Sequence, residues 1–328
     1  MVSAKLAETL SDAIAAPTYD EDKLFRRVEL STEESEHIAA EPYSYWKSVF
    51  RVFIRKPSAI IGLSVLFILL FGMIVIPLLT PEGYLDADVT LTRLNVAPCW
   101  EHLFGTTSDG VDLFFACWTG LRKSLILALI STVINIVLGT LVGLAWGFFR
   151  KLDPILIEVY NLISNIPSLL LYMLLAFVFK EAFPDLPVEA RLIIALCLTG
   201  WIGVALFVRN QTLIITNREY NVASITLGTP AWRIMLRNLL PYLLAVIITE
   251  FSLMLPGMVS SEVAMSFFGV GLPPTEISIG VLLDNGRRYF TSRPWQLLAP
   301  AGALAFIIFT FYLMGLALSD ALDPRKHR

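Results

Sequence analysis

The chain has 328 residues, of which 56% are hydrophobic and 16% are charged, and its formal net charge is −3. Its mean hydropathy is +0.68, and its apolar runs are near the roughly 20 residues that a helix needs to cross a bilayer. Soluble domains seldom have this composition, and the slight negative charge gives no support for nucleic-acid binding. The sequence is therefore that of a membrane protein.

The apolar runs predict an all-α membrane protein with six transmembrane helices. Only helices and closed barrels satisfy their backbone groups in lipid, and these runs are too long and continuous for barrel strands. The predicted spans are 58–79, 124–149, 155–179, 192–208, 239–258 and 297–317.

Charge placement predicts the orientation of these spans. If the N-terminus is inside, a clear majority of the 25 Lys and Arg residues lies on the inner side, as the positive-inside rule requires. An even number of spans then places both termini in the cytoplasm. The divisions that we expect are a cytoplasmic tail (1–57), the first transmembrane helix (58–79), an extracytoplasmic loop (80–119), a transmembrane domain (120–320) and a cytoplasmic C-terminal tail (321–328).

Residues 1–42 are polar and rich in acids, and they lack the apolar core of a secretory signal. We expect a partly disordered cytoplasmic tail there. The outer loop contains glycines and acids between His102 and Leu113, which suit a turn that starts a helix along the membrane surface. Cys99 and Cys117 also lie outside the membrane and could pair, although we favour free thiols. No metal-ligand spacing appears among the histidines and cysteines.

The second span has small or polar residues at intervals of four. Such residues allow the backbones of two helices to approach closely, so this face predicts tight packing against another helix. The residues are Ser131, Asn135, Gly139, Gly143 and Gly147.

The third span carries Glu158, Asn161, Asn165 and Ser168 at intervals that place them on one face of a continuous helix. Polar side chains in a span face the bundle interior or a water-filled path. Two interpretations remain open: hydrogen bonds between helices, or the lining of a translocation path.

Two glutamates accompany the fifth span. Glu250 lies near its middle, where a lone carboxylate is costly, so it could line a cavity, bind a cationic substrate, relay protons or hydrogen-bond a neighbouring helix. Glu262 is expected just past the span, where it could shape an extracellular gate or make a helix-terminal hydrogen bond. The segment 266–274 is rich in glycine and proline and is similar to a re-entrant or interfacial piece.

The stretch from Arg209 to Pro241 lies between two spans and is too long for a simple hairpin. Asn217 is a plausible N-cap, Gly228 is placed as a helix C′ glycine, and Thr229-Pro230 suits an N-cap followed by a first-turn proline. The pattern predicts two short helices at about 217–240, separated by a glycine, on the cytoplasmic side. Such a pair is suited to bind another protein.

The sequence lacks the motifs of several enzyme classes. It has no Gly-x-x-x-x-Gly-Lys-Ser/Thr phosphate loop, no Gly-x-Ser-x-Gly elbow and no His-Glu-x-x-His pair. ATP hydrolysis through a phosphate loop on this chain is therefore excluded, and no internal repeat suggests a doubled bundle.

The stretch at 217–240 resembles the cytoplasmic signature of ATP-binding-cassette (ABC) importer permeases, Glu-Ala-Ala-x-x-x-Gly followed by a distant Leu-Pro. Here Val222 replaces the leading Glu and Ser224 the second Ala, while Glu219-Tyr220 matches the pattern of dipeptide and oligopeptide permeases. The remaining matches to the signature are Ala223, Gly228, Leu240 and Pro241. Segments 102–112, 266–271 and 320–325 are similar to the C-type subunits of peptide permeases, and 42–50 is similar to Ami-type oligopeptide permeases.

This resemblance implies a type I ABC importer permease fold in a bacterial cell membrane, with the two short helices acting as coupling helices that bind ATPase subunits. The implied ATPase-coupling residues are Glu219, Tyr220, Ala223, Ser224, Gly228, Thr229 and Pro230. The implied partners are a second, homologous permease, two cytoplasmic ATPases that hold ATP and Mg²⁺, and an extracytoplasmic peptide-binding protein. No catalytic residue, metal or cofactor is expected on this chain, whose candidate path residues are those already named at 158, 161, 165, 250 and 262.

Three other functions compete with a peptide importer. A permease of the same family could carry another small solute, such as a nickel complex or an opine. A proton-coupled secondary transporter could use Glu250 as its relay, but it would not need the stretch at 217–240. A membrane-bound enzyme or assembly factor would need a reactive cluster, and the sequence offers none.

Overall fold

The computed structural model describes residues 45–81, 84–86 and 93–322, with side chains from Val49 onward, and its residues from Trp46 onward form one unit. These residues form helices and loops, and no strand longer than the isolated bridge between Thr106 and Asp112 occurs in these ranges. The helices in chain order are α4 (Tyr45–Arg55), α5 (Pro57–Leu78), α6 (Leu113–Phe148), η1 (Arg150–Leu152), α7 (Asp153–Ser164), α8 (Ser168–Ala182), α9 (Val188–Thr216), α10 (Glu219–Thr226), α11 (Ala231–Arg233), the π-helical η2 (Ile234–Leu239), α12 (Leu240–Phe267), α13 (Ile279–Arg288) and α14 (Trp295–Leu322).

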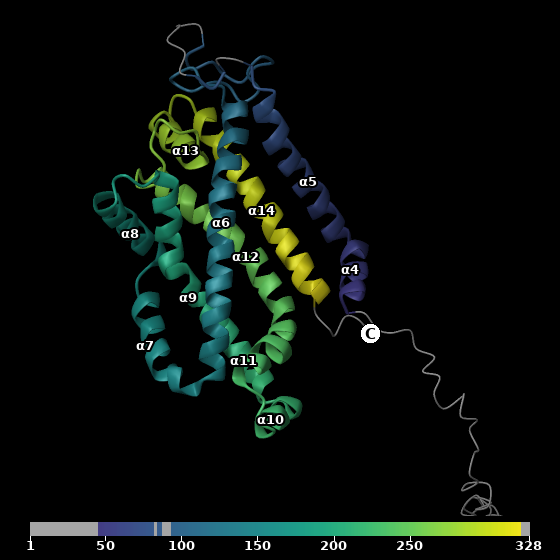
Figure 1. The fold of residues 1–328 in the computed structure, drawn as a ribbon. Helices are drawn as coiled ribbons and strands as arrows, with labels where there is room; N and C mark the ends of the chain where they lie inside the picture. The colour runs from purple at the N-terminus through teal and green to yellow at the C-terminus, as the bar shows by residue number, and fades with distance from the viewer. Residues whose placement is uncertain (1–44, 82–83, 87–92, 323–328) are drawn as a thin grey trace, which may run out of the picture. The chain divides into compact units, whose positions relative to one another are not determined.

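The predicted all-α membrane fold is confirmed. In the described part of the chain, α5, α6, α9, the continuous Ala231–Phe267 helix and α14 are each long and apolar enough to cross a membrane, and the bent pair α7–α8 gives a sixth crossing if it is counted as one. Figure 1 shows α10 at one end of this bundle, with α13 and the segment before α6 at the opposite end.

The central contact of the bundle is between α6 and α9, as the small residues of the second span predict. A Cβ atom added at Gly143 would lie 2.5 Å from the carbonyl oxygen of Ala205, and one at Gly139 would lie 2.5 Å from Cβ of Val204. Gly147 approaches Thr212 and the Arg209 carbonyl in the same way. The glycine face of α6 is therefore filled by the backbone and small side chains of α9.

The second span begins earlier than predicted. Asp112 caps α6, because its Oδ1 accepts hydrogen bonds from the backbone N–H groups of Phe114 at 2.8 Å and Phe115 at 3.3 Å. The helix then continues for 36 residues, about 54 Å, well beyond a hydrocarbon core of roughly 30 Å. The expected surface helix is thus the first part of α6 itself, and the outer loop is shorter than 80–119.

The third span is not the continuous helix that was predicted. It breaks between α7 and α8, and the two helices are bent by 89° relative to each other. Pro167 precedes α8, and a proline disfavours helical geometry in the residue before it. Glu158 and Asn161 lie on α7 and Asn165 is its C-cap, but Ser168 begins α8, so the four polar residues do not share one helix face.

The second of the two expected short helices is also different. After α10 and Gly228, the chain enters α11 at Ala231, and from there helix continues through η2 into α12. Pro241 stands in the first turn of α12, but helix already precedes it, so its missing N–H removes one backbone hydrogen bond from the continuous helix next to the π-helical η2. The predicted boundaries are each one residue early, since Arg218 and Pro230 are the N-caps rather than Asn217 and Thr229.

Three further differences concern the ends of the bundle. Glu262 lies within α12, which extends to Phe267, rather than beyond the span. The re-entrant piece expected at 266–274 is the end of α12 followed by a turn, in which Leu272 is buried and packs on protein. Helices α4 and α13 were not predicted. Cys99 is exposed, Cys117 is buried in α6, and both are free thiols, as we favoured.

Candidate functional site

Helix α10 projects from one end of the bundle and ends at Gly228, as the sequence predicts (Figure 1). Gly228 has φ +78°, a conformation that favours glycine. Its N–H donates to the Ile225 carbonyl at 3.0 Å, and the Thr229 N–H donates to the Ser224 carbonyl at 3.1 Å. These two bonds form a Schellman cap, which stops the helix and turns the chain toward Pro230.

Large apolar side chains are exposed around this cap. Leu227, the C-cap of α10, is 85% exposed, and Trp232, in the first turn of the continuous Ala231–Phe267 helix, is 60% exposed. Exposed apolar patches of this kind are typical of surfaces that contact another protein or the membrane. We call this set the α10 surface, and its members are Tyr220, Val222, Ile225, Leu227, Trp232 and Leu236.

The predicted coupling residues lie on or beside the α10 surface. Glu219 opens α10 and is exposed, as are Ala223 and Pro230, while Ser224 and Thr229 are half-buried. The Ser224 hydroxyl donates to the Tyr220 carbonyl at 2.8 Å. Burial raises the pKa of the Tyr220 phenol, and the nearby Tyr242 adds to this shift, so the phenol stays neutral at physiological pH.

One residue that sequence reasoning missed joins α10 to the bundle. The side chain of Asn221 is fully buried. Its Nδ2 donates to the Ile215 carbonyl near the end of α9 at 2.8 Å, and its Oδ1 accepts from Asn238 Nδ2 in η2 at 3.1 Å. Asn221 therefore ties α10 both to α9 and to the helix that leads into α12.

A second polar cluster fixes α7 at the same end. Asp153 accepts hydrogen bonds from Trp146 Nε1 at 2.8 Å and from Arg209 Nε at 2.7 Å. The Arg209 guanidinium also lies over the Trp146 ring, 5.5 Å from its centroid. Side chains of α6, α7 and α9 thus meet at one point beside the start of the bent pair.

The candidate path residues are not gathered into one cluster. Glu158, Asn161 and Asn165 are exposed on α7 or at its end, and their side chains form no hydrogen bond with another described residue. Glu250 is half-buried in α12. Glu262 is buried and accepts a hydrogen bond from Ser266 Oγ at 2.9 Å, while Ser266 Oγ accepts one from the Leu272 N–H at 3.1 Å. These contacts match the hydrogen-bonding interpretation of Glu262, and its role at a gate stays a prediction.

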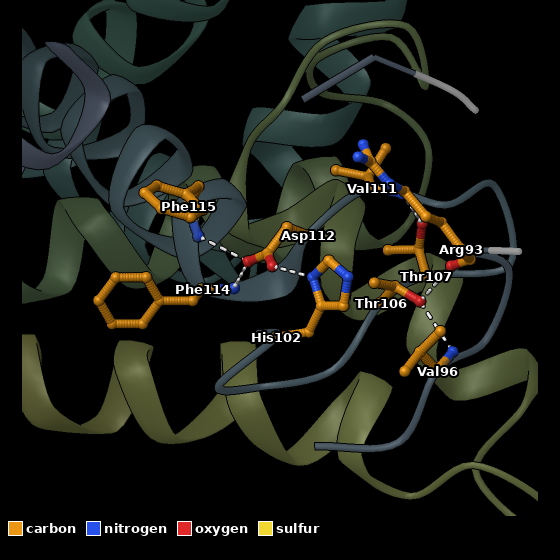
Figure 2. Close-up of polar contacts among 9 residues, drawn as sticks. All are labelled: Arg93, Val96, His102, Thr106, Thr107, Val111, Asp112, Phe114 and Phe115. Carbon is orange, nitrogen blue, oxygen red and sulfur yellow. Dashed lines mark hydrogen bonds and ion pairs between the residues drawn. The ribbon is translucent and has the colours of Figure 1, made fainter. Parts of the chain in front are cut away.

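The opposite end of the bundle carries a tightly bonded loop, shown in Figure 2. His102 Nδ1 lies 2.6 Å from Oδ2 of Asp112, and both side chains are buried. Thr106 Oγ1 donates to the Arg93 carbonyl at 2.6 Å and accepts from the Val96 N–H at 2.8 Å. The Gln296 side chain of α14 donates to the Thr106 carbonyl at 2.9 Å. Residues 102–112 of this chain, which resemble a segment of peptide permeases, therefore fix this loop to α6 and α14.

Among the described residues, no group of three or more His, Cys, Asp or Glu side chains could hold a metal ion. The bundle of apolar crossings, the exposed α10 surface and the polar breaks in the spans are the features of a multi-pass membrane transport protein.

Comparison with known proteins gives the family. Residues 135–328 match the model of the binding-protein-dependent transport system inner membrane component, and residues 44–98 match the N-terminal transmembrane domain of oligopeptide transport permease C. The first match covers more than half of the chain. The chain therefore belongs to the family of binding-protein-dependent transport system inner membrane components.

Several relatives match over almost their whole length. The oligopeptide transport system permease protein AmiD of Streptococcus pneumoniae is 38% identical over 95% of this chain and 99% of its own. The oligopeptide transport system permease protein OppC of Bacillus subtilis is 29% identical over 93% of this chain and 98% of its own. The dipeptide transport system permease protein DppC of Bacillus subtilis is 31% identical over 94% of both chains.

Proposed function

We propose that this chain is the C-type permease subunit of an ATP-driven oligopeptide importer in a bacterial cell membrane. Its relatives are named as oligopeptide and dipeptide permeases. The observation that carries the proposal is the α10 surface, an exposed apolar patch on the segment that resembles the ATPase-contacting signature of importer permeases. ATP and Mg²⁺ are then held by the partner subunits, and this chain performs no catalysis.

The proposed complex pairs this chain with a second, homologous permease, two cytoplasmic ATPases and an extracytoplasmic peptide-binding protein. Both termini and the α10 surface lie in the cytoplasm, which agrees with the excess of Lys and Arg on that side. The loop of Figure 2 and α13 then face outward. Glu158, Asn161, Asn165 and Glu250 line part of the path, and Glu262 supports its outer end.

Coupling in this proposal follows the contacts of Asn221. ATP binding closes the ATPases and displaces α10, and Asn221 transfers that displacement to α9 and, through Asn238, to the start of α12. Because α9 packs closely on the glycine face of α6, the three helices move together. The angle between α7 and α8 gives the bundle a joint at which an inward-facing and an outward-facing arrangement can differ.

Uptake of labelled peptides of graded length in a strain that lacks this chain tests the proposal. Reintroducing the chain should restore ATP-dependent uptake, and removal of the ATPase partners should abolish it. Uptake that persists without the ATPases and follows a proton gradient would instead identify a secondary transporter. In that case Glu250→Gln should abolish uptake, whereas in an importer a neutral Gln at this half-buried position should retain most of it.

The same strain separates peptides from other solutes of the family. Restored uptake of a nickel complex or an opine, without restored uptake of any peptide, would contradict the peptide substrate and leave the importer intact.

A further inference from the structure

A small pocket lies between α8, α9 and the turn that follows α12. Its volume is about 180 Å³, below the 300–1,000 Å³ that is usual for drug-sized ligands, so it suits one chemical group rather than a whole molecule. Apolar side chains form most of its wall, and two cationic residues, Lys180 and Arg191, complete it. The apolar members are Ala176, Phe177, Val188, Leu192, Val270 and Leu272.

The two cations of the pocket are not neutralised by the protein. The Arg191 guanidinium contacts only the Lys180 carbonyl oxygen, at 3.5 Å, and neither side chain forms an ion pair with a carboxylate of the described residues. Two nearby acids are occupied elsewhere, since Lys123 binds Glu189 at 3.1 Å and Glu276 at 2.6 Å. The acids Glu181 and Asp185 follow Lys180 in the sequence but do not line the pocket.

The wall of the pocket restricts what can enter it. The turn after α12 supplies no free backbone donor, because the N–H groups of Val270 and Gly271 donate to Met265 and that of Leu272 donates to Ser266. Pro273 and Pro274 have no N–H. Charge recognition in the pocket therefore depends on Lys180 and Arg191, and the other side chains that line it are apolar.

The pocket is lined in part by the bent helix pair α7–α8, which also carries three of the candidate path residues. Helix α7 carries Glu158 and Asn161 as exposed side chains, and polar side chains at membrane depth face protein or water rather than lipid. Helix α8 follows α7, and Lys180 lies in its last turn, toward the end of the bundle opposite the α10 surface. Under the proposed orientation, the pocket therefore lies toward the outer side of the membrane, from which a peptide enters.

We propose that Lys180 and Arg191 receive the C-terminal carboxylate of a peptide as it enters the path, while the apolar wall contacts its last side chain. The inference rests on the proposed peptide import and adds the recognition of one substrate group. Cations that line one pocket can give a carboxylate charge-assisted hydrogen bonds, which are stronger than neutral ones. The pocket would then select peptides with a free C-terminus after they leave the binding protein.

The test measures uptake of one peptide in two forms, with a free C-terminal carboxylate and with a C-terminal amide. Both are offered to proteoliposomes that contain the whole complex and the same binding protein. Because both permease variants receive substrate from one binding protein, the ratio of acid to amide uptake cancels that protein's own preference. Lys180→Gln/Arg191→Gln should lower uptake of the free acid about tenfold and leave uptake of the amide unchanged. The ratio is also independent of how much complex is assembled.

A matched variant at the same end of the bundle serves as the control. Arg287 and Arg288 are also cationic, but both are paired with Asp284, at 2.7 Å and 3.0 Å. Arg287→Gln/Arg288→Gln should leave the ratio unchanged. If the double variant of the pocket does not assemble, Lys180→Gln alone carries the test, because its side chain is exposed.

Three outcomes would overturn the inference. One is an unchanged acid-to-amide ratio, and another is a change of the same size in the control variant. The third is an equal loss for acid and amide that occurs only in vesicles with phosphatidylglycerol and not in phosphatidylcholine alone, which would assign the pocket to a lipid phosphate. If the wild-type complex transports neither peptide with ATP, the proposed function fails instead.

Discussion

Gly228 is the residue on which the shape of the α10 surface depends most directly. Its φ of +78° is strained for a β-branched residue, yet a Cβ atom there would meet nothing within 4 Å. Gly228→Val should therefore misdirect the chain after α10 through backbone strain alone, at a cost of about 1–3 kcal/mol. Peptide uptake and coupled ATP hydrolysis should fall several-fold while the amount of protein in the membrane is unchanged.

Gly228→Asn is the control that separates backbone strain from the loss of glycine itself at this position. Asn tolerates the left-handed region better than other residues, so Gly228→Asn should retain most of the uptake. Equal uptake by the Val variant and the wild type would show that the Schellman cap is not needed for coupling.

Asn221 makes the buried polar contacts between α10 and the bundle. Asn221→Ala leaves the Ile215 carbonyl and the Asn238 amide without these partners, which costs about 1–3 kcal/mol. ATP hydrolysis by the purified complex should then persist while its stimulation by loaded binding protein is largely lost. Thr226→Ala, which removes only hydrogen bonds within α10, should leave this stimulation intact, and equal behaviour of the two variants would argue against Asn221 as the connection.

Gly228, Asn221 and Glu262 differ in how far the sequence alone predicts their structural roles. Gly228 was predictable because a C′ glycine is a local signal that depends on its own φ. The role of Asn221 was not, because its partners Ile215 and Asn238 are brought to it only by the folded chain. Glu262 was placed outside its helix because Ser260, Ser261 and Ser266 made the end of an apolar run look like the end of the helix.

At the scale of elements, the α6–α9 contact is the firmest part of the bundle. Gly143→Ala places a Cβ atom 2.5 Å from the Ala205 carbonyl oxygen, so the two helices must separate or bend. The expected cost is about 1–3 kcal/mol, seen as a lower midpoint of thermal unfolding in detergent. Gly203→Ala on α9 is the control, because a Cβ atom there meets nothing within 4 Å. The contact would be less tight than described if both variants unfolded at the same temperature.

The elements that sequence reasoning missed share a physical cause. The break before α8 had a local signal in Pro167, but the apolar run continues across it, and run length alone cannot report a bend of 89°. Helix α13 has only ten residues, and its amphipathic pattern lies inside a segment that reads as a loop. The union of α11, η2 and α12 was hidden because Pro241 reads as a helix start, although helix already precedes it.

At the scale of the whole molecule, composition and apolar runs were sufficient for the fold class, since backbone groups in lipid allow few alternatives. They could not show which surfaces are left for partners. The exposed Leu227 and Trp232 and the unpaired cations at 180 and 191 became visible only when the helices were placed together. Both surfaces lie at ends of the bundle, which is where an importer meets its ATPases and its substrate.

The central claim is that the ATPase subunits bind the α10 surface and transmit their motion to this chain there. A cross-link at Leu227 tests it most directly. Leu227 is 85% exposed, so Leu227→Cys, with the exposed Cys99 changed to Ser, gives a reactive thiol without disturbing the core. In intact membranes a maleimide–benzophenone reagent attached to this cysteine should join it to an ATPase subunit on irradiation, because the photoreactive end needs no thiol on the partner, and addition of ATP should alter the yield. Labelling of the same cysteine from outside the cell by a membrane-impermeant maleimide, with no ATPase adduct, would contradict the account.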